Sequence, residues 1–298
     1  MARINEVRMK GVILSDPKII KDEETNYART YMVVARDYRR VDNGIHHMET
    51  DRPFVITTEP FLVEEMEKVN AGDIVDVKGV VVTRMINKTS FCANCNIENK
   101  VPGMITFVTP MFIEKCGHVD SLDECQEYLS RIRPISNNVD VYGRLTRDPK
   151  KISPKNGLTV TQYQIGVKRN YKIKDDPPEI DSDYPWIKTY GKMAEEDRCR
   201  LKEGSIVRLD AYLQTRNVQR YTVCPHCGTK YYWKDKAMEI VPYDIEYVRD
   251  YRSDEEIEEL KASRLKSSLA QIFGNDDDLI TDDDIIAGMD DYSSGDTY

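Results

Sequence analysis

The 298-residue sequence lacks any apolar run long enough to cross a membrane, and its first residues contain no apolar signal-peptide core. It also lacks the glycine–lysine phosphate loop, the His-Glu-x-x-His zinc motif and the nucleophile elbow of hydrolases. Its four histidines form no catalytic constellation. These absences predict a cytoplasmic protein that is not an enzyme and has no membrane partner.

Positive charge is also in deficit, because the chain carries a formal net charge of −9 at pH 7. The excess is confined to residues 275–298, which contain nine aspartates and neither lysine nor arginine. Residues 1–274 therefore sum to zero, and their cations can gather on one face. The acidic segment cannot bury enough apolar surface to fold, so we expect a disordered tail that solubilises the chain or recruits partner proteins.

Two halves of the sequence repeat one another at a constant shift of 132 residues. The matched positions are Gly11 with Gly143, Asp16-Pro17 with Asp148-Pro149, Tyr31 with Tyr163, Gly72 with Gly204, Thr83-Arg84 with Thr215-Arg216, Cys92 with Cys224, and Cys95 with Cys227. A period of this length is too long for a solenoid. Each copy is therefore predicted to be a domain with its own core.

Each copy is predicted to contain five strands, with a short helix between the third and the fourth. The expected strands are residues 7–14, 28–36, 53–58, 74–84 and 104–115 in the first copy, and 139–146, 158–168, 185–190, 205–216 and 237–248 in the second. This order is typical of the oligonucleotide-binding (OB) barrel. A helix that opens with a capping box follows each barrel, at Ser121 and at Ser253. Residues 134–138 are the expected linker.

The sequence thus predicts a mainly β protein of two tandem five-stranded OB-fold barrels. Each barrel has a CxxC-bearing hairpin between its fourth and fifth strands and a following helix. The predicted boundaries are residues 1–133 and 134–252 for the two barrels, 253–274 for the C-terminal helix and 275–298 for the disordered acidic tail. The apolar stripe of the C-terminal helix could pack on its own barrel or on a partner.

Three blocks within residues 183–222 resemble a known family. They are Tyr190-Gly191-Lys192-Met193-Ala194-Glu195, Leu201-Lys202-Glu203-Gly204 and Leu213-Gln214-Thr215-Arg216. Together they resemble the signature of bacterial single-stranded DNA-binding (SSB) proteins. The resemblance implies binding of single-stranded DNA in replication, recombination and repair, in the nucleoid or in a host cytoplasm if a virus encodes the chain. It also suggests a homodimer, and an acidic tail that recruits replication and repair proteins.

Single strands bind proteins by stacking on aromatic rings and by cations along the backbone. The predicted rings are Tyr171, which follows the second strand of copy two, and Trp186 and Tyr190 on the third strand, where the resembled family stacks bases. Any of the three could instead belong to the core. Tyr31 and Tyr163 are predicted to be core residues, because apolar side chains share their strand faces.

Cations beside these strands are the candidate phosphate contacts, although a lone surface arginine is more often merely solvated. They are Arg36, Arg84, Arg144, Arg147, Lys168, Arg169 and Arg216. The hairpin of copy two adds aromatic residues interleaved with lysines and arginine, which suits an arm laid along nucleic acid. Its candidates are Tyr221, Tyr232 and Trp233. Copy one lacks this mixture, so copy two is expected to carry most of the binding.

Seven cysteines without a secretion signal favour free thiols or metal ligands over a disulfide framework. Each CxxC supplies two of the four ligands that zinc needs. Cys116 and Cys125 are predicted to be small buried hydrophobes, and Cys199 lies in no motif, which leaves the two CxxC pairs. We therefore hypothesise that Cys92, Cys95, Cys224 and Cys227 share one Zn²⁺. Two sites completed by a second chain, and no metal at all, stay open. A zinc-stabilised scaffold for protein or RNA is the alternative function.

Overall fold

The computed structural model describes residues 4–22, 26–37, 48–152, 158–169, 171–173, 176–177 and 179–273. The acidic tail predicted for residues 275–298 lies outside these ranges. The fold is mainly β, as the sequence predicts. Among the described residues, every helix is too short or too polar to cross a membrane.

The two copies of the repeat form two sets of elements, which we call unit 1 and unit 2. Unit 1 contains β1 (Asn5–Ile13), β2 (Lys18–Lys21), β3 (Asn26–Ala35), β4 (Thr50–Asp51), β5 (Phe54–Thr57), α1 (Pro60–Glu67), β6 (Asp73–Phe91), β7 (Glu98–His118) and α2 (Leu122–Ser136). Unit 2 contains β8 (Asn137–Leu145), β9 (Lys150–Ile152), β10 (Val160–Lys168), β11 (Ser182–Asp183), β12 (Trp186–Tyr190), α3 (Gly191–Arg200), β13 (Ile206–Val223), β14 (Lys230–Arg249) and α4 (Asp254–Phe273).

Strand pairing in unit 2 repeats that in unit 1 at the predicted shift. Equivalent antiparallel pairs are Val7 with Gly79 and Val139 with Ala211, and equivalent parallel pairs are Val55 with Val108 and Ile187 with Ile240. The hairpins end in equivalent pairs too, Phe91 with Glu98 and Val223 with Lys230. The repeat seen in the sequence is therefore also a repeat of backbone register.

One strand departs from the constant shift. β10 is displaced by one residue relative to β3 when each is compared with its partner strand. Tyr163 is fully buried, as predicted, but Tyr31 is only half-buried, and its ring stacks on Phe54 with centroids 4.6 Å apart. The prediction that Tyr31 is a core residue is wrong because a slip of one residue moves a side chain to the other face of the strand.

The first strands of the two units, β1 and β8, pair with each other, so both units belong to one sheet. Val7 pairs with Val139, its own counterpart in the repeat, which makes the contact self-complementary about a local two-fold axis. Buried residues of both units form one continuous cluster, whereas the sequence predicted separate cores. The units share a core because each first strand covers the edge that the other would otherwise leave exposed.

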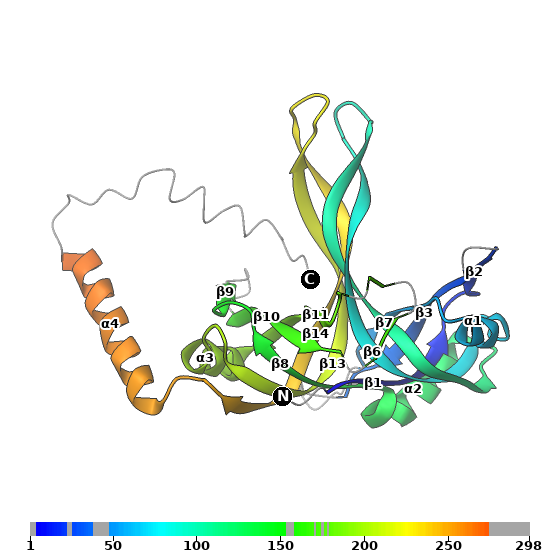
Figure 1. Cartoon of the computed structure of the whole chain (residues 1–298), viewed down its shortest axis with the longest axis horizontal. Coiled ribbons are helices and arrows are strands. Elements are labelled where there is room, and N and C mark those ends of the chain that lie inside the picture. Colours follow the sequence, from blue (N-terminus) through cyan, green and yellow to red (C-terminus); the bar gives the residue numbers. More distant parts are fainter. Residues whose placement is uncertain are drawn as a thin grey trace.

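Two long hairpins, β6–β7 and β13–β14, rise side by side from the body (Figure 1). We call the pair the tower, with arm 1 at residues 85–104 and arm 2 at residues 217–236. The arms are in contact, because Lys88 Nζ lies 2.7 Å from Asp235 Oδ2 and the hydroxyls of Ser90 and Tyr231 are 2.7 Å apart. Between the fourth and fifth predicted strands of the first copy, β6 and β7 continue as a hairpin and leave only residues 92–97 as the turn.

The helix after each unit takes a different path. α2 folds back on unit 1, where Ser136 Oγ donates to the carbonyl of Lys10 at 2.6 Å. It continues through Pro134 into β8, so the linker expected at residues 134–138 is absent; a proline in the last turn removes only one helix hydrogen bond. α4 instead points away from the body (Figure 1), and at its start Asp254 is paired with Arg200 at 3.2 Å.

Candidate functional site

An exposed cation lies over a half-buried ring on unit 2. The guanidinium of Arg147 is 5.7 Å from the ring centre of Trp186, which lies on β12. Arg147 is exposed, as are Arg144 and Lys168, two of the other predicted phosphate contacts. The half-buried ring offers a base a surface to stack on, and the exposed guanidinium over it can bind a phosphate.

A matching arrangement in unit 1 was missed by the sequence prediction. Phe54 holds the position equivalent to Trp186 and has the guanidinium of Arg29 at 5.9 Å from its ring centre. Its stacked neighbour Tyr31 has the Lys236 ammonium 4.8 Å from its ring centre. The signal that could have found Phe54 was the repeat itself, since the shift of 132 residues places Phe54 on Trp186.

Tyr171 and Arg169 lie at the contact between the units. The Tyr171 hydroxyl donates to Asp183 Oδ2 and accepts from the Asn5 amide, both at 3.1 Å, and its ring packs against an apolar cluster of unit 1. Burial raises the pKa of the Tyr171 hydroxyl. Arg169 is 6% exposed and gives Asp183 two bonds, at 2.6 and 2.7 Å. Arg169 is therefore buried, and Tyr171 is half-buried with its hydroxyl already bonded.

A second group of polar side chains lies beneath the surface of unit 2, where they bond to one another. Lys188, which lies two residues from both Trp186 and Tyr190 on β12, is 2% exposed, and burial lowers its pKa to about 8. Arg216 donates two bonds of 2.9 Å to the buried Glu239. The Tyr190 hydroxyl donates to the Gln214 side chain at 2.9 Å. The polar groups of Lys188, Arg216 and Tyr190 therefore have their partners inside the protein.

The remaining two predicted phosphate contacts are also paired with carboxylates. Arg36 binds Asp51 and Glu49, and its guanidinium lies 5.3 Å from the ring centre of Tyr212. Arg84 binds Asp176. Of the seven predicted cations, Arg144, Arg147 and Lys168 are the exposed ones, and Lys168 lies 3.7 Å from a carboxylate oxygen of Asp181.

The predicted aromatic residues of arm 2 divide between its two faces. Tyr232 is 64% exposed, and its ring meets that of Tyr221 edge-on at 6.4 Å. Lys230 lies 5.9 Å from the ring centre of Tyr221. On the other face, Tyr231 is buried and Trp233 is half-buried, and both pack against a cluster of cysteines.

Cys92 and Cys95 of arm 1 meet Cys224 and Cys227 of arm 2 where the two hairpins turn. The Sγ atoms of Cys92 and Cys227 are 3.7 Å apart, those of Cys95 and Cys224 are 3.6 Å apart, and all four lie within 4.8 Å of one another. Four sulfurs at 2.3 Å from a tetrahedral zinc lie about 3.8 Å apart. The cluster therefore has the donors and the spacing to hold a metal ion.

The surroundings of the cluster favour a thiolate at one ligand. Hydrogen bonds from Thr229, and from the Asn94 amide at 3.7 Å, lower the pKa of Cys227 to about 6. The thiolate is the form of cysteine that binds metals. The prediction that Cys116 is buried is wrong: it is exposed on β7, and Cys125 is half-buried.

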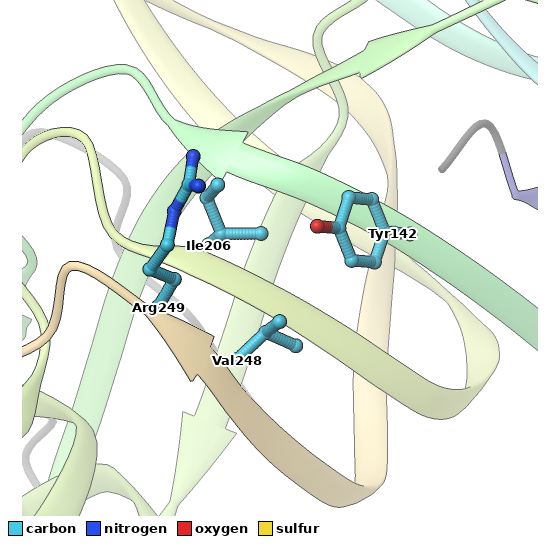
Figure 2. Close-up of a pocket in the computed structure, with 4 residues that line it drawn as sticks. All are labelled: Tyr142, Ile206, Val248 and Arg249. Atoms are coloured by element: carbon cyan, nitrogen blue, oxygen red, sulfur yellow. The ribbon is translucent and has the colours of Figure 1, made fainter. Parts of the chain in front are cut away.

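A pocket of about 230 Å³ lies on the outside of unit 2 (Figure 2). Its lining residues are Tyr142, Ile206, Val248 and Arg249, from β8, β13 and β14. Tyr142 is the counterpart of Lys10, which α2 contacts in unit 1. The pocket thus marks a surface that α4 does not cover, and its lining is divided between two apolar and two polar side chains.

Comparison with known proteins gives sequence and structural matches. Residues 136–224 match the model of the single-strand binding protein family. Single-stranded DNA-binding protein 1 of Staphylococcus aureus (strain MSSA476) is 26% identical over 135 residues, which are 45% of this chain and 80% of that protein. Single-stranded DNA-binding protein A of Bacillus subtilis is 34% identical over 83 residues, which are 28% of this chain and 47% of that protein.

The fold also has solved counterparts. The wild-type single-stranded DNA-binding protein of Thermus aquaticus superposes with a TM-score of 0.56 at 14% identity, covering 85% of this chain and 97% of that one. At this level of sequence identity, the structural similarity is evidence for the fold alone. The resemblance first seen in residues 183–222 is thereby confirmed: this chain is similar to the SSB-type single-stranded DNA-binding proteins, in sequence over residues 136–224 and in fold over most of its length.

Proposed function

We propose that this protein binds and protects single-stranded DNA during replication, recombination and repair, without a catalytic step. Arg147 over Trp186 is the observation that carries the proposal, because it places an exposed cation and a ring together within the segment that matches the family. Bases would stack on the ring while phosphates bind the cations. Stacking needs only the π-face that every base has, so binding would tolerate any sequence.

We further propose that units 1 and 2 are two OB-fold domains in tandem, at residues 1–133 and 134–252, followed by a helix at 253–274 and an acidic tail at 275–298. The strand pairs β1–β6, β5–β7 and β6–β7 of unit 1 recur as β8–β13, β12–β14 and β13–β14 in unit 2, which supports this division. The tail would recruit replication and repair proteins and compete with DNA for the cations. A homodimer and a location in the cytoplasm or nucleoid complete the proposal.

The exposed and half-buried candidates would make the first DNA contacts. These are Trp186, Arg144, Arg147 and Lys168 on the body and Tyr221 and Tyr232 on arm 2. Arg36, Arg84, Arg169 and Arg216 would reach a phosphate only by leaving a carboxylate, and Tyr171 and Tyr190 would reach a base only by leaving a hydrogen bond. Trp233 would contribute by supporting the cysteine cluster on which it packs.

We assign the cysteine cluster to one Zn²⁺ shared by the two arms. The sulfur spacing matches a tetrahedral thiolate site, and the ligands come in equal number from each unit. One ion would then clamp unit 1 to unit 2 at the end of the tower furthest from their shared sheet. This arrangement needs no second chain to complete the site.

Titration with oligo(dT), followed by the fluorescence of Trp186 and Trp233 at two salt concentrations, tests the proposed function. Binding should quench the fluorescence, and log K should fall with log salt at a slope of about −0.7 for each phosphate contact. Replacing Trp186 with Phe should remove the stacking-dependent part of the signal while keeping a ring. No binding of oligo(dT) would refute the function.

A scaffold that binds protein or RNA is the second candidate. Arm 1 favours it, because Met85 is 70% exposed and Phe91 is 58% exposed, and apolar side chains of this kind suit a protein partner. Titration with oligo(rU) under the same conditions separates the two functions. Tighter binding of RNA than of DNA would support the scaffold.

A further inference from the structure

We propose that a bound single strand follows one continuous track, from the Tyr31–Phe54 ring pair of unit 1 onto the outer face of arm 2. The inference rests on the proposed function. It adds that the bound DNA strand crosses from one unit to the other and contacts only one of the two arms. The sequence had assigned most of the binding to the second copy alone.

The outer face of arm 2 is a ladder of rings and cations. Cross-strand pairs place eight side chains on it: Asn217 with Lys236, Gln219 with Lys234, Tyr221 with Tyr232, and Val223 with Lys230. Side chains two residues apart share a face of a strand, so the ladder is continuous over about 20 Å. It carries three lysines and two tyrosines and no carboxylate.

The foot of this ladder touches the ring pair of unit 1. The Lys236 ammonium lies 4.8 Å from the centre of the Tyr31 ring, and Tyr31 stacks on Phe54 at 4.6 Å. Arg29 adds a cation 5.9 Å from the centre of the Phe54 ring. Rings and cations therefore extend from the body of unit 1 onto an arm that belongs to unit 2.

Arm 1 offers the same geometry with different chemistry. Its equivalent face carries Met85, Asn87, Thr89, Phe91, Glu98, Lys100, Pro102 and Met104. One lysine is balanced by one glutamate, and a single exposed aromatic ring is present. At the foot, Met104 Sδ lies 4.0 Å from Gln164 Nε2, where arm 2 has Lys236 over Tyr31. Arm 1 thus lacks the run of lysines without a carboxylate partner and the pair of tyrosines that arm 2 carries.

Cations elsewhere on the tower are paired with carboxylates. Lys88 and Arg220 both pair with Asp235, each at 2.7 Å. Within the described part of the chain, Lys230, Lys234 and Lys236 form no salt bridge with a carboxylate. The outer face of arm 2 therefore keeps its positive charge for a ligand. Exposed rings between the cations favour unpaired bases over an acidic peptide, which would need the cations alone.

Matched substitutions at the two arms test the track. Tyr232→Ala should weaken binding of an oligo(dT) long enough to span both units by about 5- to 100-fold, the effect of losing one stacked base. Phe91→Ala removes a ring of similar exposure from arm 1 and should leave affinity within about twofold. Lys236→Ala should reduce the salt slope by about 0.7, whereas Lys100→Ala should not. Circular dichroism and metal content confirm that each variant is folded.

The possible results distinguish a failure of the proposed track from a failure of the proposed function. If the wild-type chain binds oligo(dT) and Tyr232→Ala costs no more than Phe91→Ala, the track is wrong and the proposed function stands. If the wild-type chain does not bind oligo(dT), both fail. If a polyaspartate peptide binds the wild-type chain more tightly than oligo(dT), and Lys236→Ala abolishes that binding, the face is a peptide site and the track is again overturned.

Discussion

Asp51 of unit 1 accepts the backbone N–H of Thr215 of unit 2 at 2.6 Å, and the Thr215 hydroxyl at 3.2 Å. In the equivalent contact, Asp183 of unit 2 accepts the backbone N–H of Thr83 of unit 1 at 2.8 Å and the Thr83 hydroxyl at 3.4 Å. Both carboxylates are fully buried. Each unit therefore uses a buried aspartate to hold the strand that leads into the other unit's arm.

Removing one of these aspartates should destabilise the whole chain. Asp183→Ala would leave Arg169 buried without its bidentate partner and Thr83 N–H without its acceptor. Loss of one partner from a buried ion pair typically costs about 3–5 kcal/mol. Urea unfolding of the variant should show a free energy of unfolding lower by roughly that amount.

A surface pair of the same type supplies the control. Asp140 binds Arg208 at 2.8 and 3.1 Å on an exposed part of unit 2. Because water screens this pair, Asp140→Ala should cost less than about 1 kcal/mol. Equal losses for the two variants would mean that the exchanged aspartates do not lock the units together.

The fold was predictable because its signals are local. Turn glycines such as Gly72 and Gly204 adopt positive φ, +86° and +85°, so they recur wherever the chain needs the same turn. The two CxxC pairs recur at the hairpin ends, and the four-ligand rule then leads to a shared cluster. A repeat of such residues gives both the strand order and the register.

What the sequence could not predict depends on contacts across the repeat. The bonds between Asp51 and Thr215 join distant residues, and no local pattern marks them. Lys188 lies two residues from Trp186, so the two side chains share a strand face. Lys188 is nevertheless buried, because Glu239 of another strand compensates its charge. The prediction for Tyr31 failed because a one-residue shift in strand register leaves no trace in the amino-acid composition.

Loss of one thiol should abolish metal binding. Cys227→Ser removes one of four ligands from the proposed tetrahedral site. Purified wild-type protein should contain about one zinc per chain by plasma emission spectroscopy, and the variant close to none. Chelation of the wild-type protein should lower its Tm, because a metal that binds only the folded state stabilises it.

Cys116→Ser is the matched control, since Cys116 is an exposed thiol outside the cluster. Its zinc content and Tm should equal those of the wild type. Two zinc ions per chain, or zinc that survives Cys227→Ser, would contradict a single shared site.

Arg147→Ala should weaken binding of single-stranded DNA and flatten its dependence on salt. The guanidinium lies over Trp186 and faces solvent, so it can contact a phosphate beside a stacked base. Loss of one phosphate contact should reduce the magnitude of the salt slope by about 0.7 in an anisotropy titration. Arg249→Ala removes an exposed cation from the outer pocket of unit 2, and it should leave the slope unchanged.

The stability of unit 2 should depend on pH through Asp197. Asp197 is fully buried on α3, and its Oδ1 accepts a bond of 2.7 Å from the Tyr247 hydroxyl. Burial raises the pKa of this carboxyl to about 7, against about 3.9 in an unfolded chain. Between these values the folded state holds a proton that the unfolded state has lost. The free energy of unfolding should therefore fall as pH rises from about 4 to about 7, by up to roughly 1.4 kcal/mol per pH unit.

Asp197→Asn tests this directly, because the amide resembles the protonated acid and its oxygen can still accept from Tyr247. The variant should lose the extra pH dependence and should be more stable than the wild type at pH 8 in urea unfolding. Glu65 holds the equivalent place on α1, where it is partly exposed and bonded to Lys68 at 2.6 Å. Glu65→Gln should therefore keep the slope of the wild type. If Asp197→Asn kept that slope as well, the pH dependence would arise from groups other than this carboxyl.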